Sequence, residues 1–237
     1  MPEIRVPVLI LSVFLLFVLK PSASLAGTAQ MQQALHCERA LTAAARETSV
    51  PTRILKAISR TESGRNIDGE LMPWPWTINI GGQGSWFKSK SEALAHFQKN
   101  YANGSRNIDV GCFQINHRWH GARFASVEDM MDPFKNARYA AEFLKELYGE
   151  FGNWSDATGA YHSRNKELSD IYLTRFSQIL ERLDDGRPAP NQSLSLVQNT
   201  NSFPLLRGGT SSSVRGSLFP SDTTRRRNLL IPADERG

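Results

Sequence analysis

Apolar residues at helical spacing recur along most of the chain and limit the folds that it can adopt. In the segment ILKAISRTESGRN, Leu55 and Ile58 lie on one face of a helix, because side chains three or four residues apart are neighbours there. Pro51 suits the first turn of this helix, and Asp132 followed by Pro133 marks the start of a later one. Helices are predicted at residues 31–48, 51–62, 89–101, 133–149, 154–162 and 168–183.

A different pattern separates the second and third predicted helices. Residues 76–80 and 85–87 flank a glycine turn, which predicts a short two-stranded ribbon. Residues 111–116 are short and irregular, and one or two helical turns are expected there. The chain is therefore predicted to be mainly α (α+β), a single helical domain with a small β-ribbon.

The N-terminal segment has the layout of a secretory signal peptide. Arg5 precedes a run without charged residues from Val6 to Leu19, and a small-residue segment ends at Ala26. The run is shorter than the roughly 20 residues that span a bilayer as a helix. Residues 1–26 are therefore expected to be removed on export, leaving no membrane attachment; an uncleaved anchor is the alternative.

The net charge of +5 is not carried by the part of the chain that should fold. Residues 186–237 hold seven arginines against three acidic residues, whereas positive and negative charges balance over residues 27–185. Nucleic acid is therefore not an expected partner of the folded domain, residues 27–185. The basic tail, residues 186–237, lacks sustained periodicity and is predicted to be disordered.

Cys37 and Cys112 are the two cysteines of the chain. In an exported protein they are expected to form a disulfide, and the alternative is that both are small buried hydrophobic residues. A bridge between them would close a loop of about 75 residues and would stabilise the fold by on the order of 4 kcal/mol.

The helical stripe of residues 51–62 ends in an acid. Glu62 follows Ile58 by four residues and therefore lies on the apolar face of the helix. Burial against apolar side chains raises the pKa of a carboxyl group, and a protonated carboxyl near neutral pH can act as a general acid. Glu62 is therefore a candidate catalytic residue, and an ordinary surface glutamate paired with Arg60 or Arg65 is the alternative.

Three short motifs resemble those of the lytic transglycosylases with an SLT domain (family 1), which belong to the lysozyme-like superfamily. TESG at 61–64 resembles the catalytic Glu-Ser motif, DVGCFQIN at 109–116 resembles the Gly-Leu-Met-Gln-Ile-Asn motif, and GAYHS at 159–163 resembles the Ala-Tyr-Asn motif. The order and spacing agree over about residues 37–176. The resemblance implies a lysozyme-like SLT catalytic domain that acts on peptidoglycan glycan strands without a cofactor or metal.

Carried over by position, the resemblance assigns roles within each motif. Glu62 would be the single catalytic acid, and Tyr161 would hydrogen-bond to its carboxyl group. The substrate-binding residues that it implies are Ser63, Gln114, Asn116 and Tyr161. The sequence departs from the family at two places, since Cys112 and Phe113 replace the usual Leu-Met pair and His162 replaces the usual Asn.

The resemblance also implies a reaction. The β-1,4 bond between N-acetylmuramic acid and N-acetylglucosamine would be cleaved in the periplasm, with Glu62 acting as acid and then as base and with formation of 1,6-anhydro-muramic acid. Enzymes of this family often open the wall for envelope machines. By that analogy, a flagellar or secretion-system component is an expected partner of the tail.

Other interpretations are open from the sequence. A second carboxylate, Asp68 or Asp109, would make the protein a hydrolytic muramidase, and a catalytically idle protein would be a peptidoglycan-binding assembly factor. His117, His120 and Cys112 form a weak zinc pattern. The aromatic residues suited either to stacking on sugars or to core packing are Trp74, Trp76, Trp86 and Trp119.

Overall fold

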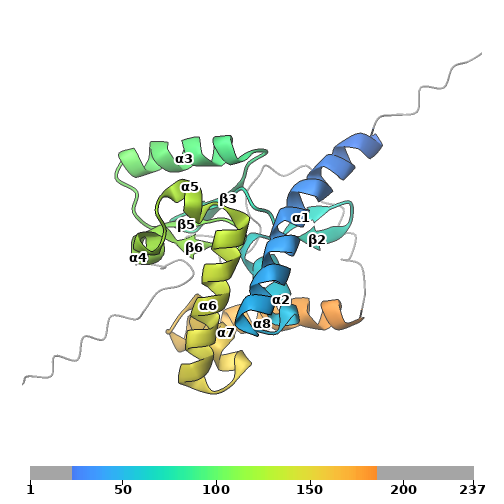
Figure 1. Cartoon of the computed structure of the whole chain (residues 1–237), viewed down its shortest axis with the longest axis vertical. Helices are drawn as coiled ribbons and strands as arrows, with labels where there is room; N and C mark the ends of the chain where they lie inside the picture. Colours follow the sequence, from blue (N-terminus) through green and yellow to red (C-terminus); the bar gives the residue numbers. More distant parts are fainter. Residues whose placement is uncertain (1–22, 186–237) are drawn as a thin grey trace, which may run out of the picture.

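Helices make up most of the structure, a computed structural model that describes residues 23–185 (Figure 1). The helices are α1 (Ala23–Thr48), α2 (Thr52–Ser63), α3 (Lys90–Ala102), α6 (Pro133–Phe151), α7 (Trp154–His162) and α8 (Lys166–Asp185), with the short turns α4 (His117–His120), η1 (Gly121–Arg123) and α5 (Val127–Met130). The six predicted helices are confirmed. Helix α1 begins at Ala23, earlier than predicted and inside the segment assigned to the signal peptide.

Local chemistry accounts for the bounds of α6. The Asp132 carboxylate accepts hydrogen bonds from the backbone N–H groups of Phe134 and Lys135, both at 3.0 Å, and so caps the helix. At the other end Gly152 has a φ of 76°, a left-handed conformation that glycine adopts without steric cost. The predicted start is confirmed, and the helix ends at Phe151 rather than Gly149.

The strands form two antiparallel sheets. β1 (Arg65–Ile67) and β2 (Glu70–Met72) make a hairpin that the sequence analysis missed. β3 (Thr77–Ile80), β4 (Gln83–Trp86), β5 (Ile108–Val110) and β6 (Ile115–Asn116) make a four-stranded sheet in the order β4-β3-β5-β6. The predicted ribbon is confirmed as β3 and β4, and β5 and β6 extend it.

The helical turns predicted at residues 111–116 are wrong. Gly111 has a φ of 82° and Gln114 has a φ of 47°, values that a right-handed helix excludes. The backbone instead makes a turn from Gly111 to Gln114, and Ile115 then pairs with Val110 of β5. This turn, residues 111–114, is called the motif loop below.

The helices enclose one main core. Helix α1 packs along α6, α2 packs on α8, and α7 contacts both α6 and α8 (Figure 1). The inward face of α8 is formed by Tyr172, Phe176 and Ile179, which are all buried. Ile171, on the same helix, is 53% exposed and lies outside this face. The mainly α fold with a small antiparallel sheet is confirmed.

Two predictions from the sequence concern segments that lie largely outside the described residues. These are the signal peptide, of which residues 1–22 are not described, and the whole tail, residues 186–237. Within residues 23–185, none of the helices is both long enough and apolar enough to cross a membrane.

Candidate active site

Glu62 lies in the last turn of α2, and the protein encloses its side chain. The residue is 4% exposed, and Leu55 and Ile58 on the same helix face are fully buried. The position inferred from the helical stripe is therefore confirmed. A carboxyl group placed in this way loses solvation, which favours its protonated form.

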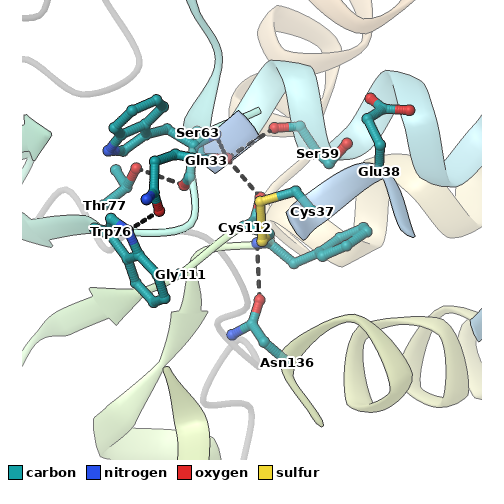
Figure 2. The surroundings of a disulfide bond; sticks show 12 residues. Gln33, Cys37, Glu38, Ser59, Ser63, Trp76, Thr77, Gly111, Cys112 and Asn136 are labelled. Atoms are coloured by element: carbon teal, nitrogen blue, oxygen red, sulfur yellow. Dashed lines mark hydrogen bonds between the residues drawn. A yellow bond between two sulfur atoms is a disulfide. The ribbon is translucent and has the colours of Figure 1, made fainter. Parts of the chain in front are cut away.

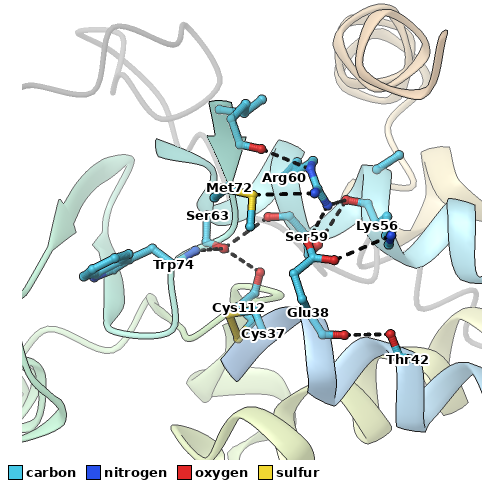
Figure 3. Close-up of polar contacts among 12 residues, drawn as sticks. Cys37, Glu38, Thr42, Lys56, Ser59, Arg60, Ser63, Met72, Trp74 and Cys112 are labelled. Atoms are coloured by element: carbon cyan, nitrogen blue, oxygen red, sulfur yellow. Dashed lines mark hydrogen bonds and ion pairs between the residues drawn. A yellow bond between two sulfur atoms is a disulfide. The ribbon is translucent and has the colours of Figure 1, made fainter. Parts of the chain in front are cut away.

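The two arginines that could have held Glu62 at the surface make other contacts. Arg60 is itself buried and forms an ion pair with Glu38 of α1 at 2.6 Å (Figure 3). Arg65 lies over the ring of Trp74, 4.4 Å from the ring centroid. With Glu62 4% exposed and both arginines engaged with other groups, the structure does not favour an ordinary surface ion pair.

Ser63 joins the end of α2 to the motif loop. Its hydroxyl donates a hydrogen bond to the backbone carbonyl of Cys112 at 2.7 Å and accepts one from the backbone N–H of Trp74 at 3.2 Å (Figure 3). The indole N–H of Trp86 donates to the backbone carbonyl of Ser63 at 3.0 Å. Because Ser63 is fully buried and these contacts are all within the protein, it holds α2 and the motif loop together.

The side chain of Asn136, on α6, fastens the motif loop from its other side. Its amide oxygen accepts from the backbone N–H of Phe113 at 2.9 Å, and its amide nitrogen donates to the carbonyls of Val110 and Met130, both at 3.0 Å. A Cβ atom added to Gly111 would lie 2.9 Å from the Asn136 amide nitrogen, so only glycine fits without a shift. The loop therefore approaches α6 closely.

The disulfide between Cys37 and Cys112 ties the same loop to α1 (Figure 2). The expected bond is present, its two Cα atoms are 5.8 Å apart, and both residues are fully buried. The side-chain amide of Gln114 donates to the carbonyls of Thr77 at 3.2 Å and Gly111 at 3.0 Å. Contacts from α1, α2, α6 and β3 thus fix one short loop beside Glu62.

Asn79, Asp109 and Asn116 form a buried polar row across the sheet. They occupy paired positions on β3, β5 and β6, so their side chains lie on the same face. The Asn116 amide donates to the Asp109 carboxylate at 2.7 Å. Burial raises the pKa of Asp109 well above its usual value, the hydrogen bond from Asn116 opposes this, and the charge of Glu62 adds to it.

Helices α7 and α8 supply the remaining polar groups around Glu62. The Tyr161 hydroxyl donates to the backbone carbonyl of Phe113 at 2.9 Å, so its proton is directed at the motif loop rather than at a carboxylate. Burial, followed by the charge of Glu62, raises the pKa of Tyr161 and of Tyr172 well above the usual value. Both hydroxyls are therefore neutral at ordinary pH, and Glu62 lies close enough to influence them.

Comparison with known families addresses the stretch that holds two of the three motifs. Residues 89–171 match the family model described as the Transglycosylase SLT domain. This stretch is similar to a transglycosylase SLT domain. The match is consistent with a lytic transglycosylase of the lysozyme-like superfamily, and it implies peptidoglycan as the substrate. No curated protein and no solved structure matches the chain.

The matched stretch contains Gln114, Asn116 and Tyr161 but begins after α2. Glu62 and Ser63 therefore lie outside it, and the folded structure is what brings them to the motif loop. The link is the hydrogen bond from the Ser63 hydroxyl to the Cys112 carbonyl, at a sequence separation of 49 residues.

The structure also bears on the zinc pattern and on the two candidates for a second carboxylate, Asp68 and Asp109. The sulfur of Cys112 is bonded to Cys37, and His120 contacts the Tyr139 hydroxyl at 2.6 Å, so the zinc pattern loses one ligand and has a second engaged elsewhere. Asp68 is exposed in the turn between β1 and β2. Asp109, by contrast, lies inside the matched stretch, and the charge of Glu62 acts on it.

The four tryptophans differ in their surroundings. Trp74 is buried in the small core beside β1 and β2, and its indole N–H donates to the Phe87 carbonyl at 2.7 Å, so it is a packing residue. Trp76 and Trp86 are half-buried, with their indole N–H groups bonded to Gln33 and to Ser63. Trp119 is 37% exposed, and the guanidinium of Arg118 lies over its ring, 4.8 Å from the ring centroid.

Three residues of the site were missed from the sequence: Asn136, Tyr172 and Arg175. Asn136 precedes Ala140 by four residues, and Arg175 follows Tyr172 by three and precedes Ile179 by four. Both polar residues therefore lie on the apolar stripe of their helix, as Glu62 does. A search for every polar residue on an apolar stripe would have found them.

His162 gives the folded protein a predictable response to acid. Burial, and secondarily the charge of Arg175, lowers the pKa of His162 to about 4 from 6.5. Between these values the unfolded chain binds a proton that the folded protein does not, so stability falls as the pH drops from 6.5 to 4. At 1.36 kcal/mol for each pKa unit, the loss should be about 3 kcal/mol.

The measurement is urea unfolding of wild type and His162→Asn at pH 7 and at pH 4.5. The variant has no imidazole to protonate, so its stability should fall by about 2 kcal/mol less than that of wild type between these two pH values. Equal losses in the two proteins would contradict a buried neutral His162.

Proposed function

We propose that the protein is an exported peptidoglycan lytic transglycosylase in which Glu62 is the single catalytic carboxyl group. The observation that most supports this is the meeting of the three motifs at Glu62. Ser63 and Tyr161 both donate hydrogen bonds to backbone carbonyls of the motif loop, and the charge of Glu62 reaches Tyr161 and Asp109.

In the proposed reaction Glu62 first acts as an acid. It protonates the glycosidic oxygen as the bond to C1 of N-acetylmuramic acid breaks, and the 2-acetamido group stabilises the positive charge at C1. The Glu62 carboxylate then accepts the proton of the muramic acid 6-hydroxyl, whose oxygen bonds to C1 and closes the 1,6-anhydro ring. One carboxyl group suffices because the substrate supplies the second reacting group.

Product analysis tests this proposal directly. The mature protein is incubated with purified sacculi, and the released muropeptides are identified by mass spectrometry. Muropeptides that end in 1,6-anhydro-muramic acid are the expected result. Products that end in reducing muramic acid, heavier by one water, would instead indicate hydrolysis.

Hydrolysis is the second candidate, because Asp109 is a buried carboxyl group close enough to Glu62 for their charges to interact. Two carboxyl groups are the usual equipment of a glycoside hydrolase. The raised pKa of Asp109 argues against this role, since it favours the neutral form, which cannot act as nucleophile or base. The leading proposal therefore assigns catalysis to Glu62 alone.

The variant Asp109→Asn separates the two candidates. Under the leading proposal it continues to release anhydro products, whereas a hydrolase would lose its reducing-end products by about 10²-fold or more. Asp68→Asn is the matched control, because Asp68 is exposed in the turn between β1 and β2.

The proposed location and partner rest on the two ends of the chain. Export to the periplasm is proposed from the signal-peptide pattern of residues 1–26, and docking on a flagellar or secretion-system component is proposed for the basic tail. The proposed division of the chain is therefore signal peptide, catalytic domain at residues 27–185, and tail. A chain ending at Asp185 should digest sacculi normally while failing to support assembly of the machine.

A further inference from the structure

Arg175 is a cation close enough to Glu62 for their charges to interact. It lies on α8, which packs on α2, the helix that carries Glu62 (Figure 1). Tyr172 precedes it by three residues and therefore lies on the same face of α8. The ring of Tyr172 stacks on that of His162, at the end of α7, with centroids 4.4 Å apart and an angle of 5° between the planes.

The environment of Arg175 is unusual for an arginine. Burial lowers its pKa to about 10, and the charges of Glu62 and then Tyr172 act in the opposite direction. The same guanidinium opposes protonation of His162. The charge of Arg175 therefore interacts with the carboxyl group of Glu62, the phenol of Tyr172 and the imidazole of His162. Of these three groups, only the carboxyl group carries a negative charge near neutral pH.

Two opposed effects then act on Glu62. Its burial favours the carboxylic acid, whereas the nearby guanidinium favours the carboxylate. The charge of Glu62 also acts on Tyr172 from α8, Tyr161 from α7 and Asp109 from β5, and none of these three side chains carries a positive charge. A buried carboxyl group without a cation would hold its proton firmly and would be a poor base.

We propose that Arg175 is a positioning residue whose charge balances the burial of Glu62, so that one carboxyl group can give up a proton and then take one back. This proposal rests on the proposed function, because it matters for catalysis only if Glu62 acts as acid and then as base. Arg175 does not itself react with the glycan. Its effect is exerted through the protonation of Glu62.

The test is the pH dependence of sacculus digestion in the full mature chain, together with a carbon-13 NMR titration of the Glu62 carboxyl group. In Arg175→Met the pH at which Glu62 loses its proton should rise by about one unit or more, because an opposite charge within a few Å shifts a carboxyl group by about 1 to 3 units. The alkaline limb of activity should move upward with it. Arg175→Lys, which keeps the charge, should shift both less.

Arg182→Met is the matched control, since Arg182 is an exposed arginine on the same helix. It should leave the titration and the activity profile as in wild type. An unchanged Glu62 titration in a folded Arg175→Met variant would overturn the proposal. The NMR titration measures protonation of the Glu62 carboxyl group whether or not glycan is cleaved. An inactive wild type would therefore refute the proposed function, and the titration would still decide whether Arg175 affects Glu62.

Loss of a partly buried cation such as Arg175 can also unfold a protein, and a second variant covers that outcome. If Arg175→Met does not fold, the double variant Glu62→Gln with Arg175→Met should recover folded protein, because neither charge is then left buried without the other. A double variant that is no more stable than Arg175→Met would overturn the proposal.

Discussion

Replacement of Glu62 by Gln is expected to reduce release of muropeptides from sacculi by about 10³-fold, within the range lost when a general acid–base group is removed. Gln keeps the size of the side chain and its capacity to hydrogen-bond, but it can neither donate nor accept the proton that the reaction moves. The main contacts that hold the motif loop in place, from Ser63, Asn136 and the disulfide, are untouched. The measurement is the initial rate of muropeptide release.

Glu70→Gln is the control for this experiment, because Glu70 is an exposed acid on β2. It should digest sacculi at the wild-type rate. Binding of Glu62→Gln to sacculi should equal that of wild type, which separates loss of chemistry from loss of substrate. If wild type binds sacculi without releasing muropeptides, the peptidoglycan-binding assembly factor is favoured. If Glu62→Gln releases muropeptides at a rate within tenfold of wild type, Glu62 is not the catalytic residue.

Removal of the Cys37–Cys112 disulfide, by Cys37→Ala with Cys112→Ala, should lower the free energy of unfolding by about 4 kcal/mol. The cross-link joins residues 75 positions apart, so its loss releases a large loop in the unfolded chain. Two fully buried sulfur atoms are also lost, which adds a packing term of the same sign. Urea unfolding at neutral pH measures the difference.

Wild type unfolded in the presence of a strong thiol reductant is the matched comparison, because it breaks the bond and keeps both side chains. It should lose slightly less stability than the double alanine variant. A loss below about 1 kcal/mol in both experiments would show that the bond adds little to the fold.

The helices of this fold follow from patterns local in sequence. The apolar stripe of α6 and its cap at Asp132 lie within about twenty residues, and together they predicted the start of the helix and, to within two residues, its end. The strand β5 has three residues and β6 has two, too few for an alternating pattern. Their pairing depends on contacts across the fold.

The candidate site likewise contains one residue that could be predicted from the sequence and one that could not. Glu62 could be found because its helix places it on an apolar stripe and because the motif around it is short. The proximity of Arg175 to Glu62 could not be found, because the two lie on helices more than a hundred residues apart in sequence. Only the packing of α8 on α2 brings their charges together.

The motif loop has one further consequence for how a glycan would be recognised. A disulfide, a serine hydroxyl and an asparagine amide hold its backbone, and a side chain on Gly111 would have no room. A segment held in this way is preorganised, so little conformational entropy remains to be lost when a ligand binds. Selectivity at this edge of the site should therefore depend on whether the glycan fits a rigid surface, and induced fit would have to come from elsewhere in the protein.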